Sequence, residues 1–289
     1  MAPVRLQKPI LPARQQIRRA LTPPRSKEYR EEAEPGTPVY HLAPKIQRSK
    51  GTLPWTEKAN PKLSRDIDTV VLDRSKKQQI TALIEKFLEP SSPKFYADRG
   101  IPYRLGFPFE GPAGTGNSSL AFALPGKFHL STYCLQLTEP DIHAEGLQHL
   151  LNNLPKRCTV LIEDLHAAEF SSSDDGISST IVRSLSMSAI LNAIDGVASP
   201  EDIIIIGTTN NSENVDRAIL RSGRLRNKFT LTLATQEDAK AMFLQFYMPT
   251  QAGAPKSDLE CAGIMPHIIE LADQFAAQLP EMTYSAADI

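Results

Sequence analysis

The chain has 289 residues, 41% of them apolar, which is enough for one large domain with a hydrophobic core and a smaller appendage. Its formal net charge of −1 gives no overall attraction to nucleic acid or to an anionic membrane, and no run reaches the roughly 18 consecutive apolar residues that a membrane-spanning helix needs. Three widely spaced cysteines, Cys134, Cys158 and Cys261, match neither a disulfide framework nor a zinc site, so a reducing compartment is expected.

The amino-terminal segment is rich in basic residues and in proline. Its first 27 residues carry seven basic side chains, no acidic side chain and five prolines. Such a composition cannot bury a core and predicts a disordered basic tail. A mitochondrial transit peptide is also arginine-rich and poor in acids, but the prolines interrupt the amphipathic helix that such a signal uses. We therefore expect residues 1–63 to form a proline-rich, largely disordered basic tail and linker, with only short extended pieces at 37–41 and near Trp55.

Strand and helix patterns alternate from about Ile67 to Ala234. The segment 69–72 is predicted to be a short apolar strand, and apolar residues then recur at helical spacing up to Leu88. Further buried strands are predicted at 105–109, 131–136, 159–162 and 203–207, and helices near 140–153, 177–194 and 236–247. This order predicts an α/β fold, a doubly wound parallel sheet covered by helices on both faces.

A last helical pattern runs from Ile264 to Phe275 and predicts a small helical lid after the sheet. Only a few residues follow this pattern, so the lid is expected to be partial. We accordingly expect a main domain over residues 64–249 and a truncated C-terminal helical lid over residues 250–289.

A glycine-rich segment lies between the strand at 105–109 and a following helix. Its residues are Gly111, Pro112, Ala113, Gly114, Thr115, Gly116, Asn117, Ser118 and Ser119. The segment matches the P-loop pattern G-x-x-x-x-G-K-[ST] at every fixed position except the lysine, where Asn117 stands. In that pattern, backbone N–H groups and the helix end hold phosphate oxygens, and the hydroxyl of Ser118 can bind Mg²⁺. Taken alone, the segment can also be a glycine-rich turn without a ligand.

Polar residues that can complete a P-loop site follow two later strands. Glu163 and Asp164 end the strand at 159–162, where Glu163 is suited to bind Mg²⁺ and Asp164 to polarise the attacking water. Asn210 follows the strand at 203–207, where its amide can hold a water molecule or a terminal phosphate. Two solvated acids and a turn-capping amide are the plainer explanations of these residues.

Two arginines, Arg221 and Arg224, follow in a turn three residues apart. Arginines so placed can reach the nucleotide of a neighbouring subunit, although each taken singly is equally explained as a surface ion pair. The joint order of glycine loop, acidic strand, Asn-ended strand and arginine pair favours a nucleotide site over these separate explanations.

Several further segments carry a family resemblance. They are Trp55, 64–66, 69–73, 95–104, 150–155, 163–164, 191–197 and 208–210. Together with the loop they resemble the AAA ATPase family, and within it the mitochondrial Bcs-type chaperones that move the folded Rieske iron–sulfur protein across the inner membrane. The order Glu163-Asp164, where most AAA proteins have Asp-Glu, favours this branch. The resemblance covers about residues 64–289.

The resemblance implies an ATPase that couples the hydrolysis of Mg²⁺-ATP to the remodelling or translocation of a protein substrate. It gives Glu163 and Asp164 the acidic-strand roles, Asn210 the sensor role, and Arg221 and Arg224 the arginine-finger roles in a homo-oligomeric ring. It also implies a mitochondrial location at the inner membrane. A cytoplasmic location is the alternative if the amino-terminal membrane anchor of that branch is genuinely missing.

Four positions depart from the family pattern. Asn117 replaces the lysine whose ammonium would bridge the terminal phosphates, so hydrolysis is expected to suffer more than binding. Pro108 falls inside the strand before the loop and is expected to displace the loop. Pro125 is expected to cut the following helix to about two turns. His166 stands where the family usually has an aspartate.

Three hypotheses about function follow. The first is a protein that binds Mg²⁺-ATP but hydrolyses it slowly, or only within a mixed ring. The second is a non-enzymatic adaptor or regulatory pseudo-ATPase subunit, which Pro108 and Asn117 favour and which the retained acids and arginines disfavour. The third is a truncated product without a stable fold.

Overall fold

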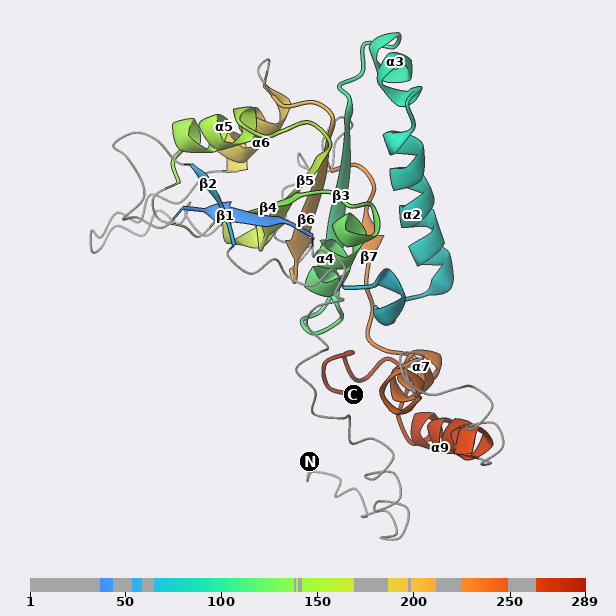
Figure 1. Cartoon of the computed structure of the whole chain (residues 1–289). Coiled ribbons are helices and arrows are strands. Elements are labelled where there is room, and N and C mark those ends of the chain that lie inside the picture. The colour runs from blue at the N-terminus through green and yellow to red at the C-terminus, as the bar shows by residue number, and fades with distance from the viewer. Residues whose placement is uncertain are drawn as a thin grey trace, which may run out of the picture.

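The computed structural model of the chain describes residues 37–43, 54–58, 65–137, 139, 142–168, 187–196, 199–211, 225–248 and 264–289. Within them lies a seven-stranded sheet in the order β2-β1-β4-β5-β6-β3-β7, shown in Figure 1. The strands are β1 (Val39–Leu42), β2 (Trp55–Glu57), β3 (Arg104–Glu110), β4 (Thr132–Gln136), β5 (Cys158–Glu163), β6 (Ile203–Thr209) and β7 (Phe229–Thr230). Every pairing is parallel except that of β1 with β2, which confirms the α/β fold.

Helices cover both faces of this sheet. They are η3 (Ile67–Thr69), α2 (Arg74–Leu88), α3 (Ser92–Ala97), α4 (Asn117–Lys127), α5 (Ala144–Asn152), η4 (Leu165–Ala168), α6 (Met187–Asp195), α7 (Gln236–Tyr247) and α9 (Ile264–Ala277). Side chains alternate along each strand, so Ile162 of β5 packs with α5 and α6, whereas Leu161 packs with α2 and α4. Figure 1 shows α5 and α6 on one side of the sheet and α2 on the other.

Two short strands that precede residue 64 extend the sheet at one edge. Tyr40 of β1 stacks on Tyr133 of β4 with ring centroids 4.6 Å apart, and the indole N–H of Trp55 donates to the carbonyl of Leu150 at 3.0 Å. These contacts anchor the strand pair to the sheet and to α5. The extended pieces that the sequence placed in a linker therefore lie in the sheet.

The segment 69–72 is not a strand, contrary to the sequence prediction. Asp66 caps η3 by accepting a hydrogen bond from the backbone N of Asp68 at 3.0 Å, and Asp73 caps α2 by accepting one from the backbone N of Lys76 at 3.0 Å. Two helix caps so close together leave too little chain between them for a sheet pairing. The apolar residues between the caps instead pack beneath α2.

Pro108 lies inside β3 and does not interrupt the strand. The carbonyl of Gly106 accepts a hydrogen bond from the backbone N of Asn227 at 3.1 Å, and that of Glu110 accepts one from Leu231 at 2.7 Å. Since alternate residues of a strand direct their backbone groups to the same neighbour, the Pro108 nitrogen also faces this side, away from β6. The missing N–H therefore costs no hydrogen bond to β6, and the expected displacement of the loop is wrong.

Helix α4 continues through Pro125 and ends at Lys127. Its 11 residues make about three turns, whereas the sequence predicted about two. Proline removes one N–H and crowds the preceding turn, but in the last turn of a helix little of the hydrogen-bond ladder remains to be lost. The Pro125 carbonyl accepts hydrogen bonds from the backbone N of Phe128 at 3.2 Å and of Leu130 at 3.0 Å, so it contributes to the helix end.

Two cysteines, Cys134 and Cys158, are buried in β4 and β5. Burial raises the pKa of the Cys158 thiol to about 12, and the nearby Asp202 carboxylate adds to this effect. The thiol is therefore protonated and unreactive near neutral pH. Cys261 lies outside the described residues.

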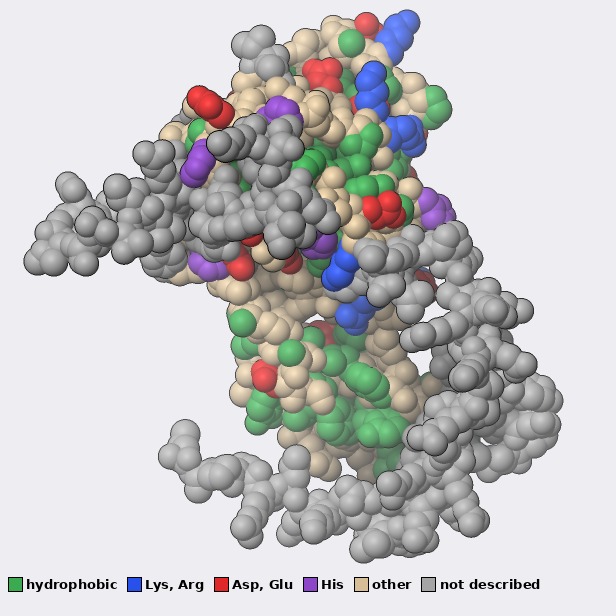
Figure 2. Space-filling model, turned by 60° about the vertical axis from the view of Figure 1, so that its left-hand side comes forward, with side chains coloured by type: hydrophobic (Ala, Val, Ile, Leu, Met, Phe, Trp, Pro, Cys, Tyr) green, Lys and Arg blue, Asp and Glu red, His purple; other side chains and the backbone are tan. Residues whose placement is uncertain are grey.

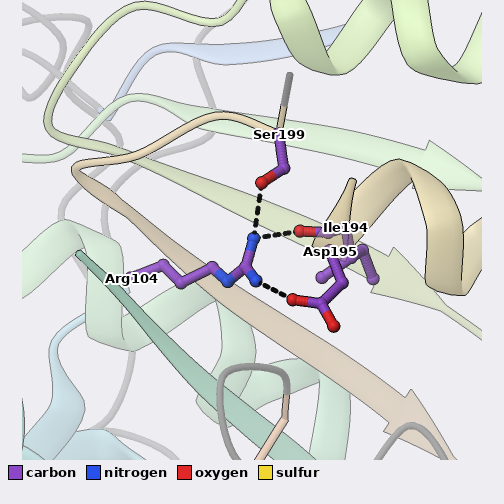
Figure 3. Close-up of polar contacts among 4 residues, drawn as sticks. All are labelled: Arg104, Ile194, Asp195 and Ser199. Carbon is purple, nitrogen blue, oxygen red and sulfur yellow. Dashed lines mark hydrogen bonds and ion pairs between the residues drawn. The ribbon is translucent and has the colours of Figure 1, made fainter. Parts of the chain in front are cut away.

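A buried arginine joins the start of β3 to the end of α6 (Figure 3). The guanidinium of Arg104 donates to the carbonyl of Ile194, to the carboxylate of Asp195, and to the hydroxyl of Ser199 at 2.8 Å. The Arg104 side chain is only 1% exposed, whereas that of Asp195 is 36% exposed. A cation at the C-terminal end of a helix is also stabilised by the helix dipole.

We expect Asp195→Ala to destabilise the protein by about 3 kcal/mol, because it leaves a buried guanidinium without this carboxylate. Arg104→Met should cost less, about 1–2 kcal/mol, because the half-exposed Asp195 can be rehydrated. The measurement is the free energy of unfolding in urea for both variants. If the two variants lose equal stability, or if Arg104→Met loses more, the Arg104 guanidinium does not depend on Asp195 to compensate its buried charge.

Helices α7 and α9 form a small lobe beside the sheet (Figure 1). The lid that the sequence predicted, residues 250–289, contains α9, whereas α7 falls within the predicted main domain. The rings of Phe243 and Phe275 pack with their centroids 5.3 Å apart, and Lys240 forms an ion pair with Asp273. Helix α7 begins with a capping box, in which the backbone N of Thr235 donates to the Asp238 carboxylate at 3.0 Å while the Thr235 hydroxyl accepts from the Asp238 backbone N at 3.1 Å.

Candidate functional site

The carboxyl ends of β5, β6 and β3 bring the predicted site residues to one edge of the sheet. The strand order places β6 between the acidic strand and the strand before the loop, so that Asn210 follows the middle strand. Glu110 is aligned with Thr209, and the backbone N of Gly111 donates to the Thr209 carbonyl at 3.3 Å. The start of the loop is therefore tied directly to the residue before Asn210.

The loop has the backbone shape that its glycines permit. Gly114 and Gly116 have φ angles of 82° and 99°, in the left-handed region that favours glycine. The Thr115 hydroxyl donates to the Pro112 carbonyl at 2.8 Å and closes a tight turn. Gly116 is the N-cap of α4, so the first-turn N–H groups of α4 have no intrahelical partner and can bind an anion.

Asn117 takes the lysine position and folds back on the loop. It is 7% exposed, and its Nδ2 donates to the Gly111 carbonyl at 3.2 Å. Its Oδ1 is buried and has no hydrogen-bond partner. The backbone of the loop therefore fits a phosphate chain, whereas this side chain offers a neutral amide with a spare acceptor where an ammonium would supply positive charge.

The two acids occupy the end of β5 and the turn that follows it. Asp164 is exposed and has a φ of 53°, which costs an L-residue on the order of 1–2 kcal/mol and marks a sharp turn into η4. Glu163 is half-buried and accepts from the Gln136 amide at 3.4 Å. The left-handed backbone conformation of Asp164 turns the chain away from the sheet directly after Glu163.

Ser118 and Glu163 remain suited to Mg²⁺. Among the described residues no group of three or more His, Cys, Asp or Glu side chains could hold a metal ion. Mg²⁺ needs no such group, because it usually keeps several waters and takes one or two protein oxygens together with phosphate oxygens. Ser119, at the end of the predicted loop, instead accepts a hydrogen bond from the Arg65 guanidinium at 2.9 Å.

A cavity of about 700 Å³ opens beside the loop. Its lining residues come from η3 and the start of α2 (Asp68, Thr69 and 71–77), from the loop (Thr115), from the approach to α7 and α7 itself (Leu231, Thr232, Ala234, Thr235, Glu237, Asp238, Ala241 and Gln245) and from the C-terminal segment (Ala286). A cavity of this size is typical of a nucleotide-sized or drug-sized ligand. Its lining is mixed, with apolar side chains such as Val71, Leu72 and Leu231 among charged and polar ones, and Thr115 joins it to the glycine-rich loop.

Hydrogen bonds between separate elements hold the walls of this cavity. The Gln245 amide of α7 donates to the Thr69 carbonyl at 3.1 Å, and the Lys76 ammonium of α2 donates to the Thr230 carbonyl at 2.8 Å. Burial lowers the pKa of Lys77, an effect that the nearby Asp68 and Asp66 carboxylates oppose. The cavity thus depends on the lobe of α7 and on the first turn of α2 being held against the sheet.

Sequence reasoning missed this cavity. Tyr96 and Tyr103, which precede the loop in the sequence, do not line it. They belong to an aromatic cluster around α3, in which the rings of Tyr103 and Phe87 stack with centroids 4.5 Å apart and the Tyr103 hydroxyl donates to the Phe87 carbonyl. The helix-capping residues Asp66 and Asp73 were the available signal, since they mark the turns that form the wall. Arg221 and Arg224 lie outside the described residues.

The C-terminal segment lies against the loop. The backbone N of Ala287 donates to the Gly114 carbonyl at 3.1 Å, and the Asp288 carboxylate accepts from the backbone N and hydroxyl of Ser285 at 3.0 and 2.7 Å. A Cβ on Gly114 would lie 3.0 Å from the Ser285 Cβ and 3.2 Å from the Ala287 Cβ. Only glycine allows the loop and the segment to approach so closely.

We therefore expect Gly114→Ala to weaken binding of a phosphate-bearing ligand at this loop by about ten-fold, since the residue must leave its left-handed conformation and displace the Ser285 turn. Gly100→Ala is the matched control, because Gly100 also has a positive φ of 59° but has no atom within 4 Å of its added Cβ. Gly114→Ala should also lose more stability than Gly100→Ala in thermal unfolding, because only its added Cβ collides with the Ser285 turn. Equal affinities for the two variants in a nucleotide titration would contradict the role given to this contact.

The fold and the edge of the sheet define a class of protein. A phosphate-binding loop between β3 and α4, an acidic strand two places away and a polar strand end between them are the parts of a P-loop nucleotide-triphosphatase domain. Residues 108–233 match the family model of the ATPase family associated with various cellular activities (AAA). The chain therefore carries an AAA ATPase domain.

Within this family the chain is similar to mitochondrial chaperones. It is 38% identical over 202 residues to the probable mitochondrial chaperone BCS1-A of Dictyostelium discoideum, covering 68% of this chain and 47% of that protein. It is 37% identical over 202 residues to the mitochondrial chaperone BCS1 of Homo sapiens, with the same coverage, and 32% identical over 229 residues to that of Danio rerio, covering 74% of this chain and 54% of the relative. The chain thus spans about half the length of these relatives. No helix in the described ranges is long and apolar enough to cross a membrane.

Proposed function

We propose that this protein binds Mg²⁺-ATP at the edge formed by β5, β6 and β3, and that it couples the nucleotide to the remodelling or translocation of a protein substrate. The observation that carries the proposal is the cavity of about 700 Å³, which opens onto Thr115 of a loop with the glycine geometry of a phosphate site. Base, sugar and phosphates require such a continuous surface. The hydrolysis step is impaired because Asn117 supplies no positive charge.

The roles of the individual side chains follow from their places. The backbone N–H groups of the loop and the first turn of α4 bind the phosphates, and Ser118 and Glu163 hold Mg²⁺ directly or through water. Asp164 orients and polarises the attacking water, and Asn210 holds that water or the terminal phosphate. Arg221 and Arg224 act on the nucleotide of a neighbouring subunit.

An assembly of several copies in a ring is part of this proposal. Figure 2 shows hydrophobic side chains gathered on the lower lobe, which α7 and α9 form. Phe246 is 76% exposed there and Ile269 is 40% exposed. Exposed apolar groups of this kind mark contact surfaces, and AAA domains generally assemble as rings. We also propose a mitochondrial location, since the similar proteins are named as mitochondrial chaperones.

Calorimetric titration of the full chain with ATP, ADP, AMP and adenosine, each with Mg²⁺, tests the binding step. The proposal predicts that affinity rises with each added phosphate, because the loop and Mg²⁺ contribute beyond the base pocket. Equal affinity for adenosine and ATP would mean that the loop binds no phosphate, and no binding of any of the four would reject the nucleotide site.

A non-enzymatic adaptor or regulatory subunit is the second candidate. The observation that favours it is the Asn117 side chain, which occupies the loop and bonds to the Gly111 carbonyl at 3.2 Å. This hydrogen bond can hold the conformation of the loop without a bound ligand. This candidate predicts that nucleotide changes neither the thermal stability of the protein nor its state of assembly in size-exclusion chromatography with light scattering.

A further inference from the structure

His166 connects the acidic turn to the strand end that precedes Asn210. It is the second residue of η4, it is half-buried, and its Nδ1 lies 3.3 Å from the Thr209 hydroxyl oxygen. The neighbouring Leu165 is fully buried and packs over Gly207, since a Cβ on that glycine would lie 3.2 Å from the Leu165 Cγ. Two adjacent residues thus hold η4 against β6.

The hydrogen bonds of Thr209 determine which group donates. Its hydroxyl proton is directed to the Asn211 carbonyl at 3.1 Å, and its oxygen also accepts from the Asn211 backbone N at 3.2 Å. A hydroxyl has one proton and two lone pairs. With the hydroxyl proton on the Asn211 carbonyl, the remaining lone pair faces His166 and is matched by the tautomer of the imidazole that carries its proton on Nδ1.

The hydrogen bond between His166 and Thr209 completes a chain of hydrogen bonds across the site. The Thr209 carbonyl accepts from Gly111 at 3.3 Å, and the Gly111 carbonyl accepts from the Asn117 amide at 3.2 Å. The acidic turn, the strand end before Asn210 and the loop are therefore joined through Thr209. Asp164 lies between β5 and η4 with a strained φ of 53°, so its direction depends on where η4 is held.

We propose that His166 is a positioning residue, which donates from Nδ1 to Thr209 and thereby fixes Asp164 and Asn210 relative to the loop where the terminal phosphate of a nucleoside triphosphate binds. The inference rests on the proposed nucleotide site and adds a residue to it. It predicts that His166 contributes to the preference for a triphosphate over a diphosphate, because the base and the first phosphates do not reach this end of the site.

The test compares His166→Asn with His166→Leu, two side chains of nearly equal shape of which only asparagine retains a donor. In Mg²⁺-nucleotide titrations, His166→Leu should lower the ratio of ATP to ADP affinity by about three- to ten-fold, the loss expected for one partly buried hydrogen bond. His166→Asn should keep the wild-type ratio. Hydrogen–deuterium exchange of the segment 209–211 should rise in His166→Leu and stay at the wild-type level in His166→Asn.

The outcomes separate this inference from the proposed function. If both variants keep the wild-type ratio and exchange, or if both lose them equally, the donor role is wrong although ATP binding stands. If the wild-type protein binds no nucleotide, the proposed function fails, and the exchange data alone decide the positioning. Faster exchange in His166→Leu only would then still support the bond to Thr209, and unchanged exchange would overturn it.

Discussion

Replacing Asn117 with lysine is expected to raise the affinity for Mg²⁺-ATP by at least about ten-fold and to raise the rate of hydrolysis further. A charge-assisted hydrogen bond contributes about 1.5–3 kcal/mol in the ground state, and charge that develops in the transition state gains more from a positioned cation. The lysine replaces an amide that now bonds to the Gly111 carbonyl at 3.2 Å and leaves one buried acceptor without a partner. Steady-state phosphate release and ATP titration measure the two effects.

Asn117→Met is the matched control for this substitution. Methionine has a similar length to lysine and also removes the bond to Gly111, but it adds no charge. If Asn117→Met raises turnover as much as Asn117→Lys, the amide obstructs the loop and charge is not the missing element. If neither variant turns over ATP, the loss of activity has another cause than residue 117.

Asp164→Asn is expected to reduce turnover by about 10²-fold or more in the Asn117→Lys background, while ATP affinity changes by less than about three-fold. Asparagine keeps the shape of aspartate but cannot accept a proton, and a positioned base typically contributes about 10²- to 10⁴-fold. Asp164 is exposed at a turn with a positive φ, so it faces solvent rather than the core. Phosphate release at saturating ATP and Mg²⁺ measures the effect.

Glu163→Gln is the comparison for Asp164→Asn. Because Glu163 is the proposed Mg²⁺ ligand, this variant should require more Mg²⁺ for half-maximal turnover, whereas Asp164→Asn should leave the Mg²⁺ requirement unchanged. Identical changes in both variants would mean that the two acids do not have separate roles.

The four central strands β4, β5, β6 and β3 could be predicted from the sequence because each is a largely apolar run between turn signals. The runs at 159–162 and 203–207 are found in β5 and β6, and the glycine pattern places the loop at the end of β3. Such features depend on residues close together in the sequence. They are the ones that local propensity and pattern determine.

The predictions that were wrong or missing concern features that depend on contacts between residues far apart in the sequence. Pro108 was expected to displace the loop, but its nitrogen faces the short strand β7, which no local pattern reveals. Trp55 was placed in a linker because its strand is short, although its indole bonds to Leu150 and fixes it beside the sheet. The cavity beside the loop was missed for the same reason, since Thr69 and Gln245 line it although they lie 176 residues apart in the sequence.

The most direct test of the central claim is a crystal structure of the full chain with Mg²⁺ and a non-hydrolysable ATP analogue. The account predicts phosphates on the backbone of the loop at 111–118 and the base in the cavity lined by Val71 and Ala234. It also predicts the metal near Ser118 and Glu163. An analogue bound elsewhere, or one that occupies this edge in neither the wild-type protein nor the Asn117→Lys variant, would contradict the assignment of this edge as a nucleotide site.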